Sequence, residues 1–163
     1  MLLSSLLFLA AVVPAAQATD TSADVARWQQ QEVDLAMAPI KSRADLDHHL
    51  RTVADSPLTR LPSAARQAFI DSLVFTPKGL GSYAWGPLAA SLDVTETWRV
   101  LSLFGLQSTT GNVPGAAPTT MVEHHMVEAT PMIQDHGNKI CVVHNPNIWC
   151  AHNYGSNCSR ACD

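Results

Sequence analysis

The amino-acid sequence predicts a mainly α fold. A small domain of about four helices, with room for a short β-hairpin, precedes an irregular, disulfide-stapled C-terminal tail. Two observations support this fold class. Apolar residues recur at helical spacing through residues 20–106, and proline, glycine, serine and aspartate mark the helix ends. All four cysteines fall within residues 141–163, where no helical period is sustained.

Residues 1–18 form an uncharged, apolar leader that we interpret as a cleaved signal peptide. An apolar run covers residues 6–13, and the small residues Ala16 and Ala18 fit a cleavage site before Thr19. The run is too short to span a membrane, which needs about 20 apolar residues, and no later stretch approaches that length. We therefore expect a secreted or periplasmic protein without an integral membrane segment. Its Ala- and Leu-rich sequence is typical of a bacterial protein.

The first two helices are predicted between residues 24 and 55. Residues 24–37 carry an imperfect apolar stripe, and Pro39 follows them as a stop signal. Ser42 caps the second helix, with Asp45 three residues later in a shorter version of the capping box. The apolar face of this helix consists of Leu46, Leu50 and Val53.

A third helix and a hairpin are predicted over residues 61–85. Pro62 suits the first turn of the helix, because its missing N–H would have no partner there. The apolar side of the helix consists of Leu61, Ala65, Phe69 and Leu73. Residues 76–79 (Thr-Pro-Lys-Gly) have the composition of a tight turn, and their short apolar flanks predict a small hairpin.

The last predicted helix, residues 93–105, has the clearest signals. A short helical turn over residues 86–92 precedes it. Asp93 and Glu96 have the spacing of a capping box, and Gly105 supplies a left-handed stop. We therefore expect residues 19–106 to form one helical domain.

The rest of the chain is expected to be largely irregular. Residues 107–140 are predicted to be a linker or extended segment, because their first part is small, polar and interrupted by proline. Residues 141–163 form the cysteine-rich tail, and the β-branched run near residues 139–144 is the one strand expected there.

The cysteines predict two disulfides in an oxidising compartment. Cys141, Cys150, Cys158 and Cys162 have the spacing C-x8-C-x7-C-x3-C, and their number is even behind a secretion signal. Four cysteines allow three connectivities, and the sequence does not choose among them.

Histidines cluster in the same half of the chain and define an alternative function. The tail histidines are His124, His125, His136, His144 and His152. Imidazole is a good ligand for Zn, Cu or Ni, and exported proteins meet these metals. None of the spacings matches a structural zinc site, so our first interpretation is that these are solvated loop residues and that the protein has no cofactor.

The function predicted from the sequence is non-enzymatic binding or an envelope-accessory role. Ten basic and fourteen acidic residues give a net charge of −4, which disfavours nucleic acid as a partner. No catalytic motif is present, so a small hydrolase ranks third, after the metal-binding alternative. We expect the recognition surface for an unknown protein or small ligand at residues 143–154, with Trp149 and Tyr154 as aromatic anchors.

Overall fold

The computed structural model describes residues 19–129 and 137–162, with side chains from Val25 onward. The predicted signal peptide and His136 lie outside the described residues. In chain order the elements are α1 (Thr19–Met37), α2 (Arg43–Thr52), η1 (Pro57–Arg60), α3 (Ser63–Asp71), β1 (Val74–Thr76), β2 (Gly79–Ala84), α4 (Gly86–Ala89), α5 (Val94–Ser102), η2 (Gln107–Asn112), α6 (Met121–Glu128), β3 (Gly137–His144), β4 (Asn147–Cys158) and η3 (Arg160–Cys162).

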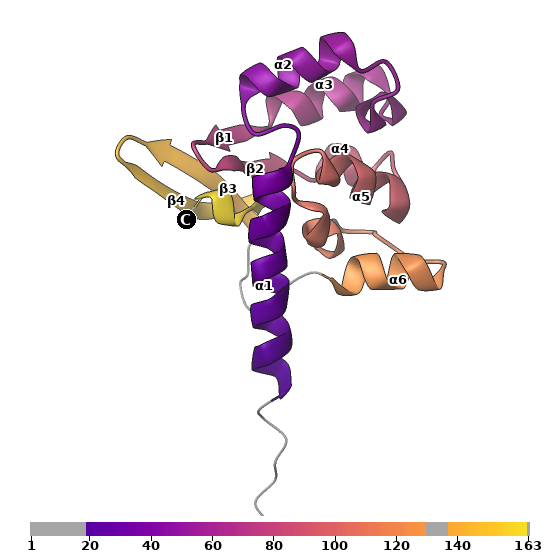
Figure 1. Cartoon of the computed structure of the whole chain (residues 1–163). Coiled ribbons are helices and arrows are strands. Elements are labelled where there is room, and N and C mark those ends of the chain that lie inside the picture. The colour runs from indigo at the N-terminus through magenta and orange to yellow at the C-terminus, as the bar shows by residue number, and fades with distance from the viewer. Residues whose placement is uncertain (1–18, 130–136, 163) are drawn as a thin grey trace, which may run out of the picture.

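Four antiparallel strands form one sheet in the order β1-β2-β4-β3 (Figure 1). The β1–β2 hairpin is the one predicted from the sequence. The end of β4 pairs with β2, so that Tyr83 lies opposite Asn157 and Ser82 opposite Cys158. The sheet therefore joins the helical half of the chain to its C-terminal segment.

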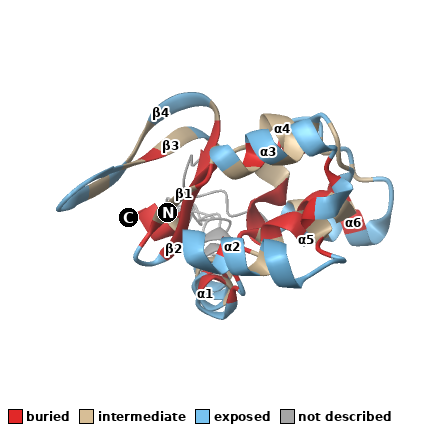
Figure 2. Cartoon of the chain, turned by 90° about the horizontal axis from the view of Figure 1, so that it is seen from above, coloured by how far each residue is buried: buried red, intermediate tan, exposed pale blue. Residues whose placement is uncertain are grey.

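The main core lies between the sheet and the helices. Phe69 from α3 contacts Tyr83 from β2 and Phe104 edge-on, each with ring centroids 6.1 Å apart. Aromatic pairs favour this edge-to-face arrangement. Ala161 from η3 also belongs to the same buried cluster, so the C-terminal segment contributes to the main core. Figure 2 shows the buried residues concentrated in β2 and α5, whereas the outer surfaces of the helices and the β3–β4 hairpin are exposed.

The caps of α2 and α5 occur where the sequence predicts them. The Ser42 side chain accepts a hydrogen bond from the Asp45 N–H. Asp93 and Glu96 form a reciprocal capping box at the start of α5. Gly105 ends that helix with φ +70°, and the Leu106 N–H returns to the Leu101 carbonyl as in a Schellman motif.

The predicted fold class is nevertheless wrong. In the described part of the chain, a curled four-stranded antiparallel sheet accompanies the helices, in place of a mainly helical domain with a short hairpin. The expected irregular tail consists mostly of β3 and β4. Apolar alternation is weak in these strands because disulfides and polar backbone pairing, more than apolar burial, hold them in place.

The segment expected as a linker also contains regular structure. η2 packs under α5, and α6 begins with a capping box formed by Thr120 and Glu123. The Glu123 carboxylate accepts hydrogen bonds from the Thr119 N–H and hydroxyl at 2.8 Å and from the Thr95 hydroxyl of α5 at 3.1 Å. These bonds lower the pKa of Glu123 to about 2, the Thr119 N–H having the largest effect.

None of the described helices is long and apolar enough to cross a bilayer.

Candidate functional site

The β3–β4 hairpin projects from the body of the protein, on the side opposite α6 (Figures 1 and 2). Its stem is regular: Cys141 pairs with Cys150, Val142 with Trp149, and Val143 with Ile148. β3 forms one edge of the sheet. The hairpin therefore offers both a side-chain face and a strand edge to its surroundings.

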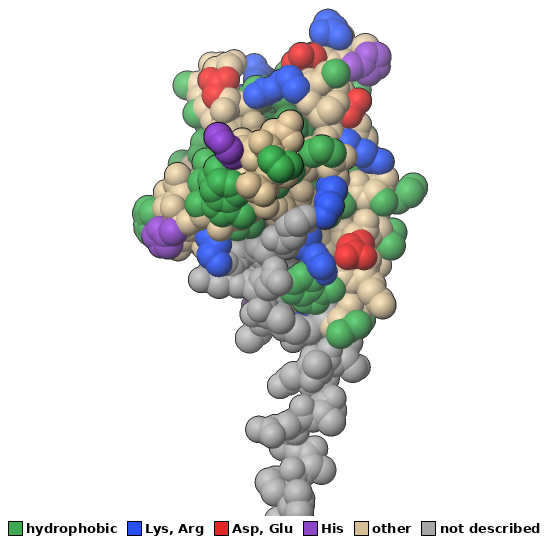
Figure 3. Space-filling model, turned by 90° about the vertical axis from the view of Figure 1, so that its left-hand side faces the viewer, with side chains coloured by type: hydrophobic (Ala, Val, Ile, Leu, Met, Phe, Trp, Pro, Cys, Tyr) green, Lys and Arg blue, Asp and Glu red, His purple; other side chains and the backbone are tan. Residues whose placement is uncertain are grey.

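The two faces of the stem differ in their environment. Residues directly opposite each other in an antiparallel pair share a face, so Cys141, Cys150 and Ile148 lie together. This face packs toward the buried cystine cluster. The other face carries Ile140, Val142, Trp149 and Ala151. Trp149 is 46% exposed, and hydrophobic side chains gather at this end of the molecule, with histidines beside them (Figure 3).

Beyond the stem, β4 bends sharply. A straight strand would separate the Cα atoms of Cys150 and Cys158 by about 26 Å, at about 3.3 Å per residue. The observed separation is 6.0 Å, and a disulfide joins the two residues. Gly155 lies within the bend at φ +98°, which only glycine adopts at low cost. The bend leaves Tyr154 78% exposed, while its ring forms a T-shaped pair with Trp85, with centroids 5.9 Å apart.

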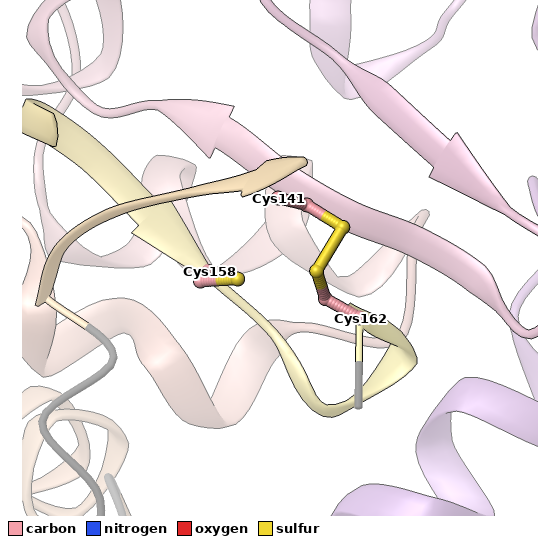
Figure 4. Close-up of side chains that lie close together, drawn as sticks. All are labelled: Cys141, Cys158 and Cys162. Atoms are coloured by element: carbon pink, nitrogen blue, oxygen red, sulfur yellow. A yellow bond between two sulfur atoms is a disulfide. The ribbon is translucent and has the colours of Figure 1, made fainter. Parts of the chain in front are cut away.

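The two predicted disulfides are present, and the structure fixes their connectivity. Cys141 joins Cys162, which ties β3 to η3, and Cys150 joins Cys158, which closes the bend in β4. The Cys158 sulfur also points toward the Cys141–Cys162 disulfide (Figure 4), and the three sulfur atoms lie within 4.8 Å of one another.

A buried polar network fixes the base of the hairpin. Asn157 donates through Nδ2 to the Tyr83 hydroxyl at 3.1 Å, and the Tyr83 hydroxyl lies 2.8 Å from Thr109 Oγ1. Thr109 in turn donates to the Leu106 carbonyl. Burial raises the pKa of Tyr83 to about 12. Sequence reasoning missed this network, because its members are far apart in the chain and none belongs to a recognisable motif.

The structure does not bring the tail histidines together among its described residues. His124 and His125 lie on α6, whereas His144 and His152 lie on the hairpin at the opposite side of the body (Figure 1). In the described part of the chain, the only group of three potential metal ligands is Cys141, Cys158 and Cys162, and disulfides occupy all three. The alternative of a Zn, Cu or Ni site therefore gains no geometric support.

One serine–histidine contact bears on the hydrolase alternative. His49 Nε2 lies 2.8 Å from Ser56 Oγ, beside a groove of about 460 Å³ between η1 and α5. Ser56 also caps η1, however, because its Oγ accepts the Leu58 N–H. Among the described residues no carboxylate hydrogen-bonds His49, so nothing orients this ring as a general base. We interpret the contact as a link between α2 and η1.

Comparison of the chain with protein-family models, with curated proteins and with solved structures finds no match. Any functional assignment therefore rests on the residues and their geometry.

Proposed function

We propose that this chain is an exported, non-enzymatic binding protein and that the β3–β4 hairpin is its recognition surface for another protein. The observation that carries the proposal is a projecting hairpin with exposed Trp149 and Tyr154 on a base tied by two disulfides. Large aromatic side chains dominate the energetics of protein interfaces, and a fixed backbone reduces the entropy lost on binding.

The composition of the hairpin supports this assignment. Residues 137–158 contain one lysine and two histidines but no aspartate or glutamate, although the whole chain carries a net charge of −4. The exposed apolar face of Val142 and Trp149 is therefore free of acidic groups. Such a surface suits a neutral or acidic protein partner with an apolar pocket.

Site-specific photo-cross-linking in the exported compartment tests the proposal. A photoreactive amino acid at Trp149 should cross-link to a discrete protein partner, and the same amino acid at Val122 should not. Val122 is a matched control because it is also exposed, at 62%, but lies on α6. Adding Tyr154→Ser should weaken the cross-link from position 149. No cross-link from position 149, or the same products from both positions, would contradict the proposal.

Export itself is tested by mass spectrometry of the protein purified from its producing cell. The mature chain should begin near Thr19 and be four hydrogens lighter than its reduced form. Full-length protein with free thiols in the cytosol would refute this part of the proposal.

A further inference from the structure

We infer that the clustered sulfur atoms of Cys141, Cys158 and Cys162 form a thiol–disulfide exchange site, whose substrate is an external thiol that enters at Cys150. The exchange is a stoichiometric reaction of the chain's own disulfides, so it goes beyond the proposed binding role without making the chain an enzyme. It follows from which sulfur is accessible and from which sulfur atoms are close together.

The exposure of the four cysteines is unequal. Cys141, Cys158 and Cys162 are at most 4% exposed, whereas Cys150 on the hairpin is partly buried. Thiolates attack disulfide sulfurs that they can reach, so an external thiolate meets Cys150 first. The sulfur of the external thiolate forms a bond to Cys150 Sγ. The Cys150–Cys158 bond breaks, and its electron pair leaves with Cys158, which becomes a thiolate.

The released Cys158 thiolate has a second disulfide as its neighbour. Its Sγ lies within 4.8 Å of both sulfurs of the Cys141–Cys162 bond and points toward them (Figure 4). Gly81 of β2 faces this disulfide and leaves space beside it, since a Cβ added there would lie only 2.8 Å from Cys141 Sγ. The released thiolate therefore lies beside a second disulfide in the folded chain.

The second exchange balances without an oxidant. Cys158 forms a bond to Cys141 or Cys162, the Cys141–Cys162 bond breaks, and the departing sulfur takes the electron pair and then a proton from water. If the substrate is a dithiol, its second sulfur attacks the mixed disulfide at Cys150 and the substrate leaves as a disulfide. The chain then holds one disulfide and two thiols.

Limited reduction of the full chain with glutathione, an external monothiol, tests the inference. After acid quenching and alkylation, peptide mapping should find glutathione on Cys150 and the alkyl label on Cys141 or Cys162. In a chain that carries a single glutathione, on Cys150, either labelled position supports the exchange, because the remaining disulfide must then include Cys158. A label confined to Cys158 would overturn it.

A pair of variants tests the same step without a reductant. Cys150→Ser removes the disulfide partner of Cys158 and leaves one free thiol inside the cluster, so the label should spread from Cys158 to Cys141 or Cys162. Cys158→Ser is the matched control: it leaves Cys150 unpaired outside the three-sulfur group, and the label should stay on Cys150. A label on Cys158 alone in the first variant would refute the exchange. If either variant fails to fold, the glutathione experiment on the unaltered chain still decides the question.

Discussion

Gly105 offers the sharpest test of how the turn after α5 packs against α1. It ends α5 at φ +70°, and a Cβ built there would lie 2.4 Å from the Asp34 carbonyl oxygen and 2.7 Å from Leu35 Cα. Both contacts are with the backbone of α1, so no flexible side chain can move aside. Gly115 has a similar φ of +82° but no atom within 4 Å of the added Cβ. The two glycines thus share the conformational effect and differ in the steric one.

The expected destabilisation follows from these two effects. A non-glycine residue in the left-handed region costs roughly 1–2 kcal/mol, partly offset by the lower entropy of the unfolded chain. Gly115→Ala should therefore lower the free energy of unfolding by about 1 kcal/mol. Gly105→Ala adds an overpacking cost of about 1–3 kcal/mol, for a total of about 2–4 kcal/mol.

Urea denaturation followed by far-ultraviolet circular dichroism measures both changes at neutral pH. The decisive quantity is the difference between the two variants, because the effect of φ cancels in it. Equal free energies of unfolding for Gly105→Ala and Gly115→Ala would refute the close contact between the turn after α5 and α1.

Three further predictions concern the network, α6 and the C-terminal segment. Because the pKa of Tyr83 is about 12 when folded and about 10 when unfolded, stability should fall by about 2–3 kcal/mol between pH 10 and 12. Urea titrations at these pH values should show that Tyr83→Phe removes most of this fall. The lowered pKa of Glu123 acts in the opposite direction: its contribution to stability is present above pH 4.5 and lost as the pH falls toward 2. Glu123→Gln should abolish this loss of stability at low pH, measured as the Tm of thermal melts. An unchanged dependence of Tm on pH would contradict the role given to Glu123. A chain that ends at Gln107 should lose its cooperative melt, since it lacks β4 and Ala161; retention of the melt would show that residues 19–106 fold alone.

The features predicted correctly from the sequence are local. A cap joins residues that are three positions apart, as Ser42 and Asp45 are, so its two halves are visible together in the sequence. Gly105 is likewise recognisable from the helix that precedes it. The Thr120–Glu123 box has the same signature, but the short run after it, cut by Pro131, gave no helical period to support it.

The features that the sequence did not reveal are non-local. The pairing of Tyr83 with Asn157 joins residues on opposite sides of the expected domain boundary, and no periodic pattern links them. The bend at Gly155 separates the two halves of β4, so the strand does not have a continuous alternation of apolar residues. The presence of two disulfides follows from composition, but their connectivity depends on that bend. The predicted anchors Trp149 and Tyr154 are exposed, yet the contact of Tyr154 with Trp85 was not foreseeable.

The closed bend between Cys150 and Cys158 also makes the protein a natural scaffold for peptide display. A protease cut anywhere between these residues would leave both new ends covalently attached, with the flanking Cα atoms still 6.0 Å apart. A foreign sequence exchanged for residues 153–154, with Gly155 kept for its positive φ, would be held as a constrained loop, because the same cystine flanks it on both sides. The Tyr83–Asn157 network and the β2–β4 pairing lie outside the exchanged residues. Such grafts can therefore vary freely in sequence while the rest of the sheet keeps its register.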